Sequence, residues 1–125
     1  MNKKDTGNSG ENIACIYLRK NGFEIVERNY QKIWGELDII AQKDGELHFV
    51  EVKSVTHGDV FDEYGHRPED NVHGLKVRHL RRIIETYLAE KGSAFRTAFH
   101  FHILCVYMDM GTRRARVKWL KDIIL

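Results

Sequence analysis

The feature that most limits how this chain can fold is a pair of alternating runs, residues 35–42 and 46–54, separated by Asp44-Gly45. This connection is a strong short-range signal for a β-hairpin, because a type I′ turn needs positive φ at both central positions. Aspartate tolerates that conformation, and glycine adopts it without steric cost. The turn sets the register, so Lys43 pairs with Glu46 and each earlier residue of the first run has a defined partner in the second.

In this register Asp38 lies opposite Glu51 and Glu36 lies opposite Lys53, with all four side chains on one face. The other face is expected to carry Leu37, Ile39, Ala41, Val50 and Val52. Since both faces are otherwise apolar, we expect the hairpin to be covered on both sides. A turn shifted by one residue would instead place Asp38 and Glu51 on opposite faces.

The remaining elements follow from hydrophobic periodicity and from stop signals. We expect helices at residues 11–21 and 73–90, and strands at residues 23–30, 97–108 and 114–120. The order along the chain is therefore α-β-β-β-α-β-β. One mixed β-sheet flanked by helices, an α/β fold, is the simplest architecture for this order.

The length predicts a single domain, residues 1–125, with frayed residues 1–7 and a polar loop at residues 56–71 that we expect to be mobile. The two cysteines have no C-x-x-C spacing, which is typical of buried thiols in a reducing compartment. No apolar run approaches the roughly 18 residues of a membrane-spanning helix. The polar start also lacks the apolar region of a signal peptide. We therefore expect a cytoplasmic protein without a membrane partner.

The two facing carboxylates carry the chemistry, because they repel each other and the repulsion grows with burial. A hard divalent cation would offset it, and Mg²⁺ (or Mn²⁺) favours one or two carboxylates with waters and phosphate oxygens. Lys53 follows Glu51 by two residues, so its ammonium group can orient a water or stabilise negative charge developing on a phosphate. The pattern indicates metal-assisted phosphodiester hydrolysis. The alternative is an ion-pair network in which Lys53 neutralises Glu51 and Asp38.

These residues resemble the PD-(D/E)xK nuclease superfamily, whose core motif is an acidic residue, a hairpin and then E-x-K. Here the motif consists of Asp38 and Glu51-Val52-Lys53. The chain is more closely similar to the YraN-like family of small bacterial proteins, themselves similar to archaeal Holliday-junction resolvases, over residues 7–121. The other matching positions are Gly10-Glu11, Ala14, Tyr17-Leu18, Gly22, Gly35–Ala41, Phe49-Val50 and Lys76.

The resemblance implies a restriction-endonuclease-like core with Asp38 and Glu51 as metal ligands and Lys53 as the catalytic lysine. Glu11 corresponds to an acidic residue of the first helix that can complete the metal shell. Its spacing from Asn8 fits a capping box equally well, so a purely structural role stays open.

The net charge is only +2, so a nucleic-acid partner has to be argued from local clusters. The second predicted helix supplies one, with nucleic-acid-binding candidates at Lys76, Arg78, Arg81 and Arg82. Such cations contact phosphates without reading bases, although the same residues could form a solvated helix face. One position departs from the family, since His102 stands where the relatives tend to have a fourth-strand aspartate.

Two hypotheses of different class follow. The first is a divalent-metal-dependent nuclease-like protein that hydrolyses phosphodiester bonds of DNA, with branched or flapped structures among the candidate substrates. The second is a non-catalytic nucleic-acid-binding module that retains the nuclease fold. The complete set of Asp38, Glu51 and Lys53 favours the first, and His102 favours the second. The sequence leaves a homo-oligomer open.

Overall fold

A computed structural model describes residues 3–56, 74–109 and 111–125, with the side chains of residues 3–8, 56 and 74–76 outside that description. The elements follow the predicted order. They are α1 (Lys3–Lys20), β1 (Glu24–Lys32), β2 (Gly35–Lys43), β3 (Glu46–Thr56), α2 (Gly74–Lys91), a short 3₁₀ turn η2 (Gly92–Ala94), β4 (Phe99–Asp109) and β5 (Arg114–Leu120).

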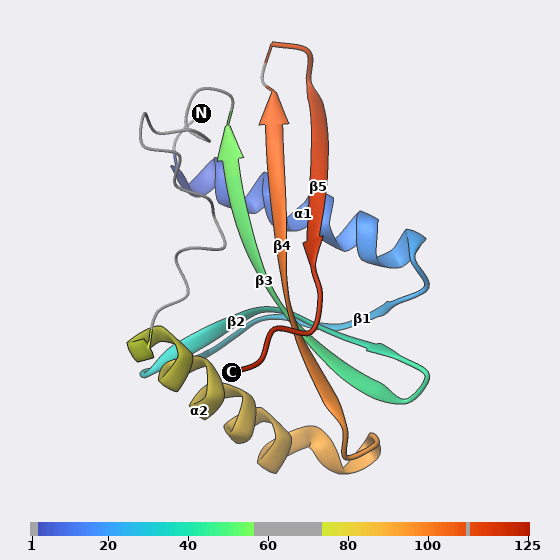
Figure 1. Cartoon of the computed structure of the whole chain (residues 1–125), viewed down its shortest axis with the longest axis vertical. Helices are drawn as coiled ribbons and strands as arrows, with labels where there is room; N and C mark the ends of the chain where they lie inside the picture. The colour runs from blue at the N-terminus through green and yellow to red at the C-terminus, as the bar shows by residue number, and fades with distance from the viewer. Residues whose placement is uncertain (1–2, 57–73, 110) are drawn as a thin grey trace.

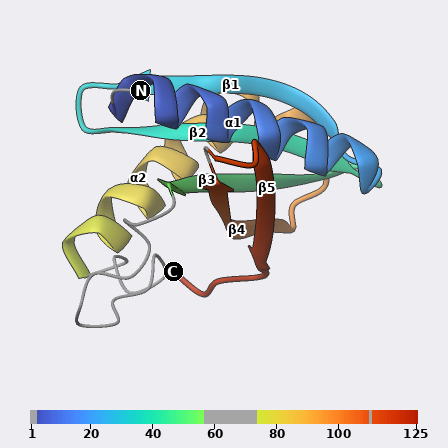
Figure 2. The same cartoon turned by 90° about the horizontal axis from the view of Figure 1, so that it is seen from above.

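The five strands form one mixed sheet in the order β1-β2-β3-β4-β5, in which only β3 and β4 run parallel. Helix α1 packs across one face of this sheet and α2 lies on the other face (Figure 1, Figure 2). The arrangement confirms the predicted α/β fold and is consistent with a restriction-endonuclease-like core. Neither helix combines the length and apolar character needed to span a membrane within the described residues.

Each face of the sheet has its own apolar core. Under α1, a stripe of Ala14, Cys15 and Leu18 packs on Ile39, Val50, Leu104 and Val106. Under α2, the stripe with helical spacing is Leu80, Ile83, Ile84 and Tyr87, which packs on Ile40, Leu47, Phe49, Phe101 and Ile103. Strand β4 contributes to both cores, and residues 101–106 are all buried. An uninterrupted buried run of this kind is typical of a strand covered on both faces.

Two turns fix the geometry around the central strands. Asp44 and Gly45 have φ values of 55° and 80°, which confirms the predicted type I′ hairpin. The end of α1 is a Schellman motif, in which Gly22 at φ 88° donates to Arg19 O and Phe23 donates to Leu18 O. The chain therefore turns directly from α1 into β1.

Helix α1 begins earlier than the sequence predicted, at Lys3 and not at Glu11. The polar composition of residues 3–10 gives no apolar periodicity by which the first turns could be recognised. Asn8 is consequently inside the helix, so the capping-box role proposed for Glu11 is wrong. The predicted mobile loop at residues 56–71 lies, apart from its first residue, outside the described residues.

The hairpin register is confirmed from Lys43↔Glu46 to Ile39↔Val50. One predicted face was wrong, because Leu37 packs in the α2 core while Ile39 packs in the α1 core. Strict alternation would place both on the same face. The neighbouring strand is irregular at the same place, since Asn29 of β1 lies between the residues that pair with Ile39 and Leu37 and has a φ of 53°.

Candidate active site at the β2–β3 fork

The candidate site lies where β2 and β3 separate. Their paired residues end at Ile39↔Val50, one step before Asp38 and Glu51 would meet, and Figure 1 shows β3 diverging from β2. At this fork the Asp38 carboxylate accepts a hydrogen bond from the Val52 backbone N–H, with Oδ2 at 2.8 Å from the nitrogen. The carboxylate thus accepts the hydrogen bond that a backbone carbonyl of β2 would accept if the pairing of β2 with β3 continued. Asp38 therefore lies at the edge of β3.

Glu51 and Lys53 come from β3 and project toward the α2 face of the sheet. Their partners on β4 are Ile103 and Cys105, which both belong to the α2 core. Lys53 Nζ lies 3.2 Å from Glu51 Oε1, and both side chains are mostly buried, with 23% and 15% of their surface exposed. This ion pair between Lys53 and Glu51 is one contact of the ion-pair network that the sequence left open as the alternative to a metal site.

Glu11 reaches the fork from α1. The helix crosses β3 so closely at Gly10 that a Cβ atom there would overlap the Ser54 side chain. This close approach explains why glycine precedes Glu11. Glu11 Oε1 is buried and has no hydrogen-bond partner among the described residues. A carboxylate oxygen in that situation bears a desolvation cost that a cation or a proton would relieve.

The four acids near the fork form one electrostatic group. Burial is the main cause that raises the pKa of Asp38 to about 7, and Glu11, Glu51 and Glu36 raise it further against the hydrogen bond from Val52. Burial also raises the pKa of Glu11, where Glu36 adds to the shift and Arg28 opposes it. Mutual repulsion of this kind is the condition in which a positive ion gains most from entering.

The fork supplies a small donor set. Among the described residues, no three histidine, cysteine, aspartate or glutamate side chains are already arranged around one metal position. Asp38 and Glu51 would offer two carboxylates, which is the number that Mg²⁺ commonly takes from a protein while it keeps waters and phosphate oxygens. The donor chemistry therefore fits Mg²⁺ or Mn²⁺ better than a metal that needs a closed protein cage.

Glu36 does not face Lys53 as the extended register implied. Its Oε2 accepts a hydrogen bond of 2.9 Å from Gln31 of β1, and its side chain is exposed. It acts on Asp38 and Glu11 through its charge.

The predicted nucleic-acid-binding residues lie on α2. Arg78, Arg81 and Arg82 are exposed, and the Arg82 guanidinium stacks 4.3 Å from the centre of the Trp34 ring. Lys76 belongs to the same helix, but its side chain lies outside the described residues. No local pattern connects Trp34 with Arg82, because their stacking depends on how α2 docks against the β1–β2 turn.

His102 lies apart from the fork, on the α1 face beside Trp119. Its Nδ1 accepts the Asp122 backbone N–H at 3.0 Å, so Nε2 carries the proton and donates to His48 Nδ1 at 2.8 Å. The ring is 3% exposed, and burial is the main cause that lowers its pKa to about 4, with His48 and His100 also lowering it. A neutral histidine bonded in this way joins β3, β4 and the C-terminal tail and does not extend the acidic group.

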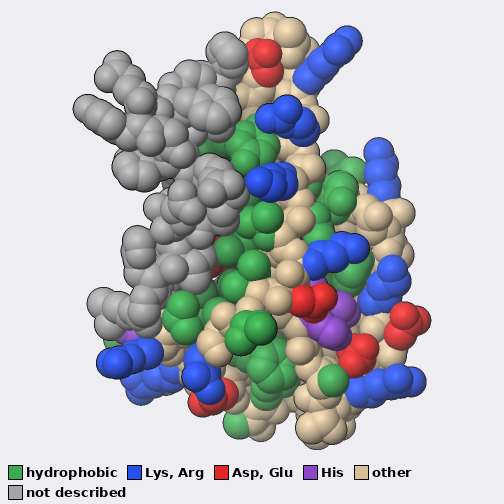
Figure 3. Space-filling model, viewed as in Figure 1, with side chains coloured by type: hydrophobic (Ala, Val, Ile, Leu, Met, Phe, Trp, Pro, Cys, Tyr) green, Lys and Arg blue, Asp and Glu red, His purple; other side chains and the backbone are tan. Residues whose placement is uncertain are grey.

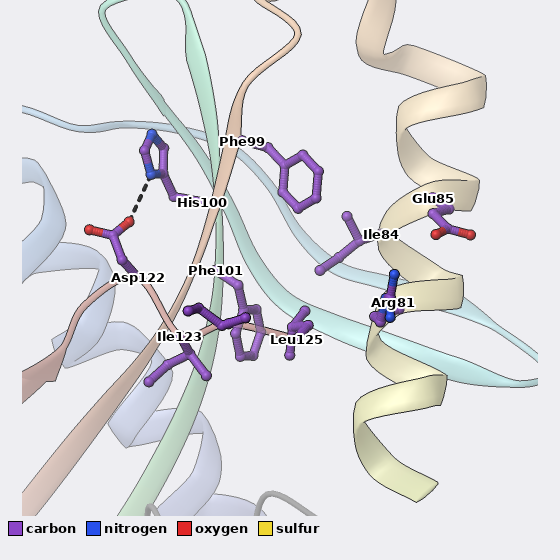
Figure 4. Close-up of a pocket in the computed structure, with 10 residues that line it drawn as sticks. Arg81, Ile84, Glu85, Phe99, His100, Phe101, Asp122, Ile123 and Leu125 are labelled. Atoms are coloured by element: carbon purple, nitrogen blue, oxygen red, sulfur yellow. Dashed lines mark hydrogen bonds and ion pairs between the residues drawn. The ribbon is translucent and has the colours of Figure 1, made fainter. Parts of the chain in front are cut away.

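A separate cavity of about 460 Å³ lies between α2, the start of β4 and the tail. Figure 4 shows Ile84 of α2 pointing toward Phe99 of β4, with Ile123 and Leu125 of the tail beside Phe101, and Arg81 of α2 also lines the cavity. The rim includes the hydrogen bond between His100 Nδ1 and Asp122 Oδ1, at 2.7 Å. None of the fork acids lines this cavity, so it is not part of the candidate site.

The fold and the fork define the class: an α/β protein with a restriction-endonuclease-like core and an acid-and-lysine group where two central strands part. The chain belongs to the uncharacterised protein family UPF0102, whose family model matches residues 10–106. This match confirms the resemblance to the YraN-like family. The family description states no activity.

Several relatives carry the name UPF0102 protein. The one from Campylobacter lari is 44% identical over 103 residues, which cover 82% of this chain and 84% of the relative. The one from Caldicellulosiruptor saccharolyticus is 35% identical over 122 residues, or 98% of each chain. The one from Helicobacter hepaticus is 43% identical over 88 residues, covering 70% and 73%.

Proposed function

We propose that this chain is a divalent-metal-dependent nuclease-like protein that hydrolyses phosphodiester bonds of DNA. The observation that carries the proposal is the burial of Asp38 among other acids, next to a lysine that is paired with one of them. This environment raises the pKa of Asp38 to about 7. A buried ionisable group with a strongly shifted pKa beside other charged groups is a candidate for a functional residue.

Asp38 and Glu51 would hold the metal ion, and Glu11, with its buried Oε1, would complete the acidic side of the site. When bound, a divalent ion supplies Lewis-acid polarisation of a phosphate oxygen and lowers the pKa of a bound water. Lys53 then has a defined task. Its ammonium group lies beside Glu51 and can orient the attacking water or stabilise the charge that develops on the phosphate.

The position of His102 bears on the alternative, a binding module without catalysis. The missing fourth-strand acid favoured that alternative at the level of sequence. In the fold, however, His102 bonds to His48 and to the tail. A histidine at this position, where relatives tend to have an acid, therefore leaves Asp38, Glu51 and Lys53 in place. The proposal rests on those three residues.

A cleavage assay on linear, flapped and four-way DNA with Mg²⁺, Mn²⁺ or EDTA tests the proposal. We expect metal-dependent cleavage by the parent chain, and a loss of at least about 100-fold in Glu51→Gln and Lys53→Ala. Matched controls are Glu85→Gln on α2 and Lys20→Ala at the end of α1, both exposed and away from the fork. If no DNA is cleaved with either metal while the parent still binds DNA, the binding module is the correct function.

A further inference from the structure

The outer strand β5 carries three cations at alternate positions, Arg114, Arg116 and Lys118, and all three are exposed. Alternate residues of a strand project to the same face. Lys118 pairs with Cys105 of β4, and Cys105 pairs with Lys53 of β3. Directly paired residues share a face, so the β5 cations lie on the face that carries Lys53 and Glu51.

This part of the sheet is not covered by either described helix. Helix α1 occupies the opposite face, and α2 lies over the part of the sheet where β2 begins (Figure 1). In the space-filling view of the same face, basic side chains follow the course of β5 (Figure 3). Within this row the Arg116 guanidinium lies 5.1 Å from the centre of the Tyr107 ring.

The row has the dimensions needed to bind a nucleic-acid strand. Residues two apart on a strand are about 6.6 Å apart, so the three cations extend over about 13 Å. A DNA strand presents one phosphate per roughly 3.4 Å of helix axis, so several phosphates fall within that length. Neighbouring strands are about 4.8 Å apart, which puts the row at about 10 Å from the Lys53 position, two strands away.

The arginines of α2 and the cations of β5 lie on two sides of the fork. Figure 1 shows α2 at the lower left of the sheet and β5 at the upper right, with β3, which carries Glu51 and Lys53, between them. Arginines of α2 and cations of β5 therefore flank the same acidic fork. A backbone crossing the fork would meet positive charge before and after the site, which compensates the repulsion between its phosphates and the four acids.

We propose that Arg114, Arg116 and Lys118 form a phosphate-binding strip that holds a DNA strand against the sheet beside the fork. The inference rests on the proposed function, because it assigns the path of the substrate to that site. Charges on an outer strand also prevent unwanted strand pairing, so the experiment has to separate binding from this role.

The test compares two double variants that remove the same number of positive charges. Arg116→Gln/Lys118→Gln alters the strip, and Arg19→Gln/Lys20→Gln alters exposed residues at the end of α1 on the opposite face. Glutamine keeps most of each aliphatic stem. Binding to duplex and to single-stranded oligonucleotides is measured by fluorescence anisotropy in EDTA, from about 50 to 200 mM salt, so that no cleavage contributes.

We expect the strip variant to bind at least about tenfold more weakly at the lowest salt concentration. Its slope of log affinity against log salt should be shallower by about 1.8 for duplex or about 1.4 for a single strand, because two phosphates are no longer neutralised. The α1 variant should match the parent. Equal affinity and slope in both variants would overturn the strip and leave the nuclease proposal standing. A parent that binds neither oligonucleotide also overturns the strip, whereas hydrolysis is judged by the separate cleavage assay.

Discussion

Replacing Asp38 by asparagine isolates the charge at the centre of the fork. The carboxylate accepts a hydrogen bond from Val52 N–H, and the amide oxygen of asparagine can accept the same bond. Strand β3 therefore keeps its partner, and the main change is the removal of an ionisable group next to Glu11, Glu51 and Glu36.

The size of the effect follows from the raised pKa. Burial and the neighbouring acids raise the pKa of Asp38 from 3.8 to about 7. Because the folded chain holds this proton more tightly than the unfolded chain, the stabilisation is complete below about pH 4 and is lost as the pH rises through about 7. At 1.36 kcal/mol per pKa unit, the parent loses up to about 4 kcal/mol over this range, and the variant does not.

Urea denaturation in EDTA at intervals from pH 4 to pH 8 measures this effect. The free energy of unfolding of Asp38→Asn minus that of the parent should increase with pH by up to about 4 kcal/mol. Titrating groups away from the fork, such as His102, are present in both chains and cancel in the difference, whereas the coupled acids Glu11, Glu51 and Glu36 contribute to the effect of the charge. Any pH-independent cost of the substitution shifts the whole curve and leaves its slope unchanged.

Adding millimolar Mg²⁺ at pH 8 should then reduce the difference in free energy of unfolding between Asp38→Asn and the parent. A ligand that binds only the folded state raises stability by mass action, and the parent retains the carboxylate that would hold it. A difference curve that stays flat from pH 4 to pH 8 would refute the electrostatic reasoning. An equal response of both chains to Mg²⁺ would remove Asp38 from the ligand set.

Three further predictions test other parts of the molecule. Lys53→Ala should abolish cleavage but keep the rise in melting temperature on adding Mg²⁺; disappearance of both would mean that Lys53 maintains the site itself. Replacing Arg78, Arg81 and Arg82 by alanine should lower duplex affinity and reduce the salt slope by about 0.9 for each phosphate that is no longer neutralised, whereas unchanged titrations would identify a solvated helix face. Because the pKa of His102 is lowered to about 4, the stability that the neutral ring contributes is present above about pH 6.5 and is lost as the pH falls toward about 4. Between these pH values His102→Gln should therefore lose about 3 kcal/mol less unfolding free energy than the parent. The same loss of unfolding free energy in both chains would contradict this.

Local rules were enough to predict most of the fold. The Asp44-Gly45 turn determined the pairing of β2 with β3, and the apolar stripes located the helices. These fold predictions succeeded because each depends on interactions between residues close in sequence. The same hairpin carries Asp38, Glu51 and Lys53, whose roles in a site stay a prediction.

What could not be predicted depends on interactions between distant residues. The parallel register of β3 and β4 aligns His48 with His100 and Val50 with His102, and no local pattern sets that alignment. The change of face between Leu37 and Ile39 occurs beside Asn29, a residue of the neighbouring strand with positive φ. The approach of Glu11 to the fork likewise depends on how α1 docks on β3.

The parallel pairing of β3 with β4 also has a kinetic consequence. Strands β1, β2 and β3 are joined by short turns, so their pairing closes only small loops and can form early. The edge of β3 that pairs with β4, along Glu51 and Lys53, stays unpaired until β4 is added. Strand β4 follows α2 in the chain, so this pairing has to close a much longer loop. During synthesis a chain released before β4 would expose that edge together with two unfinished cores. Such intermediates pair readily with other strands, so we expect truncation before Phe99 to yield an aggregating product and not a smaller folded domain.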